Sequence, residues 1–274
     1  MEQTGGTGMK KLYISADIEG TCGISAWSET IKEKPDYHAF GQRMSREVAA
    51  ACEGALEGGM DLVMVRDAHG SARNLDWSCL PRQVQLIRGW GQDPLCMMSG
   101  LDESFYGAVF TGYHDLAGSG ENPLSHTMST SLVWLTLNGE PLGEAHINAY
   151  TAALYRVPLL ALSGDSGICA KAKALVPACR TVAVNRGAGN LVHSIHPEVA
   201  LVKIREAVRQ ACQERRESFA LNLPDTFRLD VRFSQHAKAY SAGFYPGVKR
   251  LDSHTLRYEA DDWYEVLRMM HFCL

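Results

Sequence analysis

The chain has 274 residues, 46% hydrophobic and 21% charged, which is the composition of a globular protein large enough to bury a sizeable core. Its formal net charge of −4 provides no basic field for nucleic acid or for an anionic membrane surface. No apolar stretch approaches the roughly 20 residues of a membrane-spanning helix, and eight scattered cysteines without a C-x-x-C pair favour a reducing cytoplasm over a disulfide framework.

The first half of the chain predicts alternating strands and helices. Residues 1–9, MEQTGGTGM, are expected to be a flexible leader. Residues 10–20, KKLYISADIEG, form an apolar run that ends in a turn and predict a strand. Apolar residues at helical spacing over residues 40–59 predict a helix, and residues 61–70, DLVMVRDAHG, predict a second buried strand. This strand–helix–strand order is typical of a parallel crossover.

The second half adds further strands, a hairpin and two more helices. The other expected strands are residues 108–115, 157–165, 180–184, 227–233 and 255–260. Asn138–Gly139 lies between two extended segments, which is a strong hairpin signal, and a helix is expected near residues 144–155. A long amphipathic helix includes residues 201–211, and a last helix begins at Asp261.

This order of elements predicts an α/β fold with a mixed, mainly parallel sheet flanked by helices. Residues 10–190 form the expected α/β domain that carries the candidate metal site. Residues 191–274 form a C-terminal α+β segment, which is expected to pack on the same domain and leaves room for a smaller subdomain.

Carboxylates and imidazoles gather where the predicted strands end, the edge at which open α/β sheets bind ligands. They are Asp17 and Glu19 after the first strand, Asp67 and His69 after the second, and His114 and Asp115 after the third. His126, Glu144 and His146 come near the hairpin. One such residue is ordinarily a cap or a turn former, but several from distant positions favour a site.

The chemistry of this set favours a pair of metal ions. Carboxylate oxygens mixed with imidazole nitrogens suit zinc, with manganese or cobalt as alternatives. The candidates exceed the three protein ligands usual for one catalytic zinc, whereas a two-metal site, with ions roughly 3.5–4 Å apart, accommodates them. Asp17 is the natural bridging ligand, because a short carboxylate offers both oxygens with little rotamer freedom.

Five motifs in order, SADIEG, RDAHG, GYH, LSHTMS and GEAHINAY, resemble the zinc-dependent D-aminopeptidase family linked to bacterial dipeptide transport. The resemblance runs from about Lys10 to the C-terminus, with no recognised motif after residue 190. It implies a metallopeptidase, with two zinc ions per subunit, that removes N-terminal D-amino acids from short peptides. It also implies a homodecamer that encloses the sites in a cavity.

The resemblance also implies roles for individual residues. The implied metal ligands are Asp17, Glu19, His69, His114 and Glu144, and the implied catalytic residue is His126. From the residues alone, His126 could act as acid or base, as an oxyanion donor or as a nucleophile, and the first two duties are favoured because metal-bound hydroxide is available.

Several residues have weaker roles. Asp67 is expected to hydrogen-bond a ligating imidazole, Asp115 and Asp165 are candidates for holding the substrate ammonium, and Asn148 lies on the helix face of Glu144. His146, Cys22 and the loop at residues 25–38 depart from the family pattern. Histidines outside the motifs, His271 among them, are expected to be surface or capping residues, and the Trp77–Trp90 region is expected to pack in loops, in the core or at an oligomer contact.

Three alternative functions remain open. The same metal centre could hydrolyse another small amide or an L-peptide. DIEGT and SGDS also resemble motifs of magnesium-dependent haloacid-dehalogenase-type phosphohydrolases, although that hypothesis leaves His69, His114 and His126 without a role. A non-catalytic metal- or peptide-binding protein would need the ligands but no proton donor.

Overall fold

The computed structural model describes residues 8–274, and its larger layer is a seven-stranded sheet in the order β3-β2-β1-β4-β7-β8-β9. Its strands are β1 (Lys11–Ala16), β2 (Leu62–Asp67), β3 (Val84–Ile87), β4 (Phe105–Tyr113), β7 (Leu159–Asp165), β8 (Arg180–Ala188) and β9 (Leu191–Ser194). All neighbours pair in parallel except β9, which runs antiparallel to β8. The carboxyl ends of the central strands β1, β2 and β4 therefore lie at one edge.

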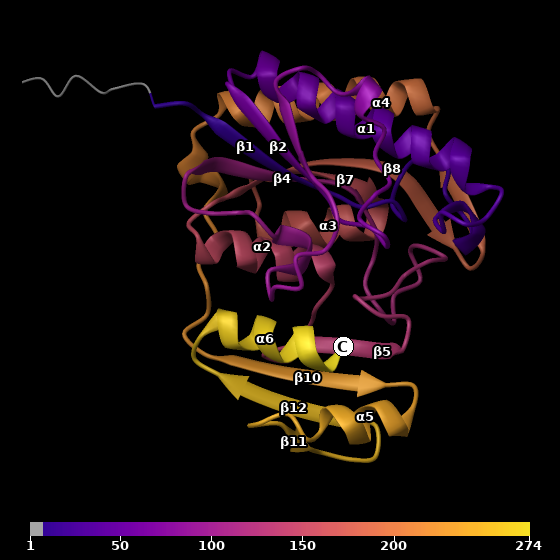
Figure 1. Cartoon of the computed structure of the whole chain (residues 1–274), viewed down its shortest axis with the longest axis vertical. Coiled ribbons are helices and arrows are strands. Elements are labelled where there is room, and N and C mark those ends of the chain that lie inside the picture. Colours follow the sequence, from indigo (N-terminus) through magenta and orange to yellow (C-terminus); the bar gives the residue numbers. More distant parts are fainter. Residues whose placement is uncertain (1–7) are drawn as a thin grey trace, which may run out of the picture.

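Helices cover both faces of this sheet (Figure 1). Helices α1 (Tyr37–Glu57) and α4 (Pro197–Gln213) lie together on one face, and α2 (Glu144–Leu154) and α3 (Ser166–Leu175) lie on the other. Gly54 lets α1 and α4 approach closely, because a Cβ at this position would overlap the carbonyl oxygen of Arg205 in α4. Helices α1 and α4 therefore cover the hydrophobic core on one face of the seven-stranded sheet.

A second, antiparallel sheet has the order β11-β12-β10-β5-β6. Its strands are β5 (Leu132–Leu137), β6 (Glu140–Pro141), β10 (Phe227–Phe233), β11 (Lys249–Arg250) and β12 (Thr255–Ala260), and its helices are α5 (His236–Ala242) and α6 (Trp263–Cys273). Helix α6 lies on the side of this sheet that faces α2 (Figure 1). The buried indole of Trp263 donates a hydrogen bond of 3.1 Å to the hydroxyl of Thr151 in α2, which connects the two layers.

The predicted α/β fold with a mixed, mainly parallel sheet is confirmed. Helix α3 was not predicted; the Asp165 side chain caps it by accepting from the Ile168 backbone N–H at 2.9 Å. The predicted boundary at residue 190 stays a prediction, and β5 and β6, which precede it, share a sheet with β10 and β12.

Other expectations concern the leader, the membrane and the cysteines. Residues 1–7 of the expected leader lie outside the described residues. Within residues 8–274 no helix is long and apolar enough to cross a membrane. All eight cysteines belong to this part of the chain, and all are free.

Candidate metal centre and its pocket

The five predicted metal ligands meet at the carboxyl edge of the central strands. Asp17 and Glu19 follow β1, His69 follows β2, His114 follows β4, and Glu144 is the first residue of α2. The parallel register aligns these ends, since Ala16 pairs with Asp67 on one side and with Thr111 on the other. Four of the five side chains are at most 5% exposed, and His69 is partly buried.

Asp17 lies between two imidazoles. Its Oδ1 is 3.3 Å from Nδ1 of His69, and its Oδ2 is 3.4 Å from Nε2 of His114. Glu19 Oε2 is 3.1 Å from the same nitrogen of His69. One carboxylate therefore contacts both halves of the cluster, as expected of a bridging ligand.

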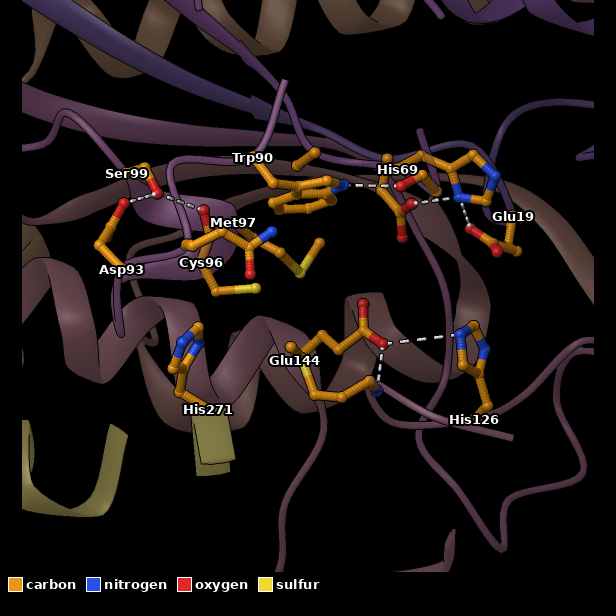
Figure 2. A pocket seen from close by; sticks show the side chains of 15 residues that line it. Glu19, His69, Trp90, Asp93, Cys96, Met97, Ser99, His126, Glu144 and His271 are labelled. Carbon is orange, nitrogen blue, oxygen red and sulfur yellow. Dashed lines mark hydrogen bonds and ion pairs between the residues drawn. The ribbon is translucent and has the colours of Figure 1, made fainter. Parts of the chain in front are cut away.

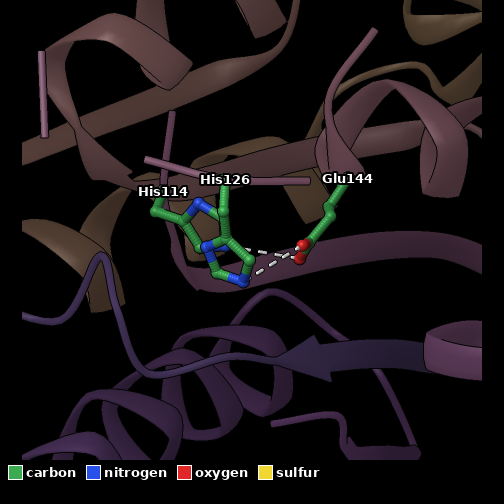
Figure 3. Close-up of side chains that lie close together, drawn as sticks. All are labelled: His114, His126 and Glu144. Carbon is green, nitrogen blue, oxygen red and sulfur yellow. Dashed lines mark ion pairs between the residues drawn. The ribbon is translucent and has the colours of Figure 1, made fainter. Parts of the chain in front are cut away.

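Glu144 joins His114 to His126 (Figure 3). Its Oε2 is 3.4 Å from Nε2 of His114, and its Oε1 is 3.7 Å from Nε2 of His126. The same Oε1 accepts a 2.6 Å hydrogen bond from the Met128 backbone N–H, which fixes the carboxylate. The predicted catalytic histidine thus lies directly beside the predicted ligands.

Backbone carbonyls set the tautomer of all three histidines. The pairs, each at 2.9 Å, are His69 Nε2 with Thr30 O, His114 Nδ1 with Asp115 O, and His126 Nδ1 with Leu124 O. Because a carbonyl only accepts, each of these nitrogens carries a hydrogen. In the neutral rings the other nitrogen then directs its lone pair toward the carboxylates, the arrangement typical of metal-ligating histidines.

Three polar atoms of this cluster are buried without a hydrogen-bond partner: Asp17 Oδ2, Glu19 Oε2 and His114 Nε2. An unpartnered buried polar group costs about 1–3 kcal/mol, so a cation bound between these atoms would stabilise the cluster. Asp17, Glu19 and His114 offer ligand atoms within 4.8 Å of one another, and so do His114, His126 and Glu144. The donor set fits a zinc-type divalent cation.

Without a metal, protons balance the negative charge of the cluster. Burial and the charges of Glu19 and Glu144 raise the pKa of Asp17 to about 8. Burial alone would lower the pKa values of His69 and His114, but the neighbouring carboxylates hold both well above the ordinary value. Burial likewise opposes the shift at Glu19, but the charge of His69 holds its pKa well below the usual range.

His126 behaves differently from the two predicted histidine ligands. Burial and the nearby charge of His114 lower its pKa. Its ring packs edge-on against Trp27, with the centroids 5.2 Å apart. His126 is therefore held neutral and partly shielded from water.

A pocket of about 430 Å³ opens beside the cluster (Figure 2). Its lining also includes Trp90, Gln92, Asp93, Cys96, Met97, Ser99 and His271. The Trp90 indole lies beside His69, where it donates to the carbonyl of Gly70 at 2.7 Å, and it stacks over the guanidinium of Arg66 at 4.5 Å. The end with the predicted ligands is called the metal end, and the end with Asp93, Cys96, Ser99 and His271 is called the far end (Figure 2).

One expectation about the pocket residues needs correction. His271 was expected on the surface or at a helix cap, and the structure places it in the pocket. Trp90 packs against the core from a loop, as expected, and also lines the pocket. No motif marks the irregular segment around Trp90, and nothing in the sequence near His271 relates it to residues more than a hundred positions earlier.

The weaker candidates lie around the cluster. Asp67 accepts hydrogen bonds from Asn74 and Leu75 rather than from an imidazole, and the Asn74 amide in turn donates to the His69 carbonyl. Asn148 donates to the Tyr113 hydroxyl at 2.7 Å and contacts the sulfur of the pocket residue Met97. Asp67 and Asn148 therefore hydrogen-bond residues around the cluster and make no hydrogen bond to the side chains of the predicted ligands.

Asp115 and Asp165 are buried side by side and away from the pocket lining. Lys171 contacts the Asp115 carboxylate at 2.8 Å, and Asp165 accepts from the Asp115 backbone N–H at 2.7 Å. The carboxylates of Asp115 and Asp165 therefore hold the loop that carries His114.

His146 is a separate case. It accepts a hydrogen bond from the backbone N–H of Gly143, and burial lowers its pKa to about 4.

Cys22 is fully buried and contacts none of the predicted ligands through its thiol. Its thiol contacts the carbonyl of Ile195 at 3.1 Å, and burial raises its pKa to about 11. It therefore packs as a protonated thiol.

Comparisons with known proteins identify relatives over nearly the whole chain. The family model Peptidase M55, D-aminopeptidase, matches residues 9–272. A D-aminopeptidase of Bacillus subtilis (strain 168) is 31% identical over 262 residues, which cover 95% of both chains. The solved structure of the Zn-dependent D-aminopeptidase DppA from Bacillus subtilis, a self-compartmentalizing protease, matches with a TM-score of 0.89 and 30% identity over 96% of each chain.

Proposed function

Because the chain belongs to the M55 peptidase family of D-aminopeptidases, we propose that it is a dinuclear zinc enzyme. It would release the N-terminal residue, a D-amino acid, from short peptides or amino acid amides. Family membership favours peptide-bond hydrolysis over the phosphohydrolase hypothesis, and the zinc dependence of the Bacillus subtilis structure supports zinc over manganese or cobalt.

The observation that carries this proposal is the position of Asp17 between His69 and His114, with unpartnered buried atoms facing the gap. One ion would be held by Asp17, Glu19 and His69, and the other by Asp17, His114 and Glu144. When bound, the two ions supply a water that ionises near neutral pH and polarise the scissile carbonyl.

His126 is proposed as the proton carrier of the reaction. Its Nε2 faces Glu144 and the pocket, and its lowered pKa leaves this nitrogen free to accept a proton. The carbonyl of Leu124 fixes the ring, so the nitrogen keeps one direction. His126 would take a proton during attack on the carbonyl and return it to the leaving amine.

The assembly and location of the protein are also proposals. The self-compartmentalizing relative supports a homo-oligomer. A homodecamer is the assembly that the family resemblance implies. Such an assembly would admit short peptides and exclude folded proteins. The eight free cysteines support a cytoplasmic location.

The decisive experiment is a hydrolysis panel of matched D- and L-aminoacyl amides and dipeptides, with and without chelator, together with metal analysis. We expect close to two zinc ions per chain, D-selective cleavage and loss of activity on chelation. Cleavage of L-substrates only would support the broader amidohydrolase alternative. A folded preparation without a zinc-type metal would overturn the dinuclear proposal.

A further inference from the structure

The pocket contains one imidazole with no partner. Of its three histidines, His69 and His126 bond backbone carbonyls and face carboxylates. The imidazole of His271 makes no hydrogen bond or ion pair with any residue in the described part of the chain, and neither lysine nor arginine lines the pocket among residues 8–274. Among the described residues that line the pocket, His271 is therefore the one with an unpartnered hydrogen-bond donor that can also carry a positive charge.

His271 reaches the pocket from the second layer of the molecule. It lies in the last turn of α6, and Figure 2 places it below Asp93 and Cys96, away from His69 and His126. Helix α6 is fixed to the first layer through Trp263. The imidazole is thus held on the side of the pocket away from the predicted catalytic residue (Figure 2).

The other charged residues of the pocket are acidic. Asp17, Glu19 and Glu144 lie at the metal end. Asp93 lies at the far end, where its oxygens accept from the Leu95 N–H at 3.0 Å and the Ser99 hydroxyl at 2.8 Å. A carboxylate that enters the far end would be repelled by Asp93. Of the unpartnered donors that line the pocket among residues 8–274, the Gln92 amide and the His271 imidazole, only the imidazole can also carry a positive charge.

A dipeptide brings such a carboxylate. With its scissile carbonyl at the metal end, its C-terminus follows one residue later, roughly 3.5 Å farther along the chain. We infer that His271 is a specificity-determining residue that donates an N–H hydrogen bond to the C-terminal carboxylate of a dipeptide substrate. The enzyme would then prefer dipeptides with a free C-terminus over their amides. This inference rests on the proposed function.

The test compares D-alanyl-glycine with its C-terminal amide, which differ only in the terminal charge. The variants are His271→Ala, His271→Gln, which keeps an N–H donor, and the control His236→Ala on an exposed face of α5. For the free dipeptide, His271→Ala should raise KM about ten- to a hundredfold with little change in kcat, as for loss of a hydrogen bond to a charged group. The amide should be unaffected, and His271→Gln should restore part of the loss.

The outcomes separate this inference from the proposed function. Equal effects of His271→Ala on both substrates, or no effect on either, would overturn the role of His271 while leaving the aminopeptidase intact. Wild-type enzyme that binds the amide as tightly as the free dipeptide would overturn it as well, without any variant. If zinc-loaded wild type cleaves neither substrate nor any other D-aminoacyl compound, the proposed function itself fails.

Discussion

The imidazole rings of His114 and His126 stack almost parallel, with an interplanar angle of 7° and centroids 4.2 Å apart. A predicted metal ligand and the predicted catalytic residue are therefore in direct contact, and Glu144 faces both. A positive charge on His114 makes protonation of His126 harder. The state of the metal cluster and the basicity of His126 are thus coupled.

Replacing His126 should separate metal binding from catalysis. We expect His126→Ala to lower kcat by about 10²–10⁴-fold, the usual contribution of a positioned acid–base group, with zinc content close to that of wild type. Steady-state kinetics and metal analysis of the same preparation measure the two effects. The control is His193→Ala, at an exposed position on β9. Full activity of His126→Ala would refute the catalytic role.

Asp17 and Glu144 should differ in how many ions they hold. Because Asp17 contacts both His69 and His114, Asp17→Asn should remove most of both zinc ions and reduce activity to background. Glu144→Gln should lose chiefly the ion next to His114. Metal analysis after dialysis against a weak chelator measures how many zinc ions each variant retains. Equal retention of metal by the two variants would contradict a bridging role for Asp17.

Zinc binding should release protons. In the metal-free protein the pKa of Asp17 is raised to about 8, and those of His69 and His114 are raised as well, so these groups are protonated at neutral pH. The metal needs them deprotonated, so apparent zinc affinity should rise with pH until these groups have lost their protons.

Calorimetric titration of the metal-free protein in buffers of different ionisation enthalpy measures this release. The observed binding enthalpy should vary linearly with the buffer enthalpy at pH 7. Identical enthalpies in all buffers would mean that the cluster is already deprotonated, contrary to this expectation.

The contact between α1 and α4 should be sensitive to a single methyl group. Gly54→Ala places a Cβ onto the carbonyl oxygen of Arg205 and should destabilise the fold by about 1–3 kcal/mol, as overpacking does. The matched control is Gly120→Ala, because a Cβ at Gly120 would meet nothing within 4 Å. Urea unfolding compares the variants. A Gly54→Ala protein as stable as the control would show that the helices can separate without cost.

The metal cluster was predictable because parallel strands place their ends at one edge. Once β1, β2 and β4 are recognised as neighbours, Asp17, His69 and His114 must approach one another. The exact contacts of Asp17 depend on the side-chain conformations of its neighbours, which the sequence pattern does not encode. The helical spacing of α1 was equally clear, since Met44, Val48, Ala51 and Ala55 recur every three to four residues and all are buried.

The pocket residues beyond the predicted ligands could not be predicted from the sequence, and the reason is physical. Trp90 belongs to an irregular segment, whose path depends on tertiary contacts such as the stack on Arg66. His271 depends on how α6 packs against the first layer, which no local periodicity encodes. Helix α3 was missed because its start, at Asp165 and Ser166, continues directly from an apolar strand.

The hydrogen bond between Trp263 and Thr151 has a consequence for how this family can diversify. It fixes α6, which carries His271, relative to α2, which carries Glu144. On the inference that His271 binds the C-terminal carboxylate of the substrate, the spacing between these helices would set the longest peptide that fits. Substitutions in their contact would then lengthen or shorten the accepted substrate while every predicted metal ligand stays in place, so enzymes with identical ligands need not share a substrate length.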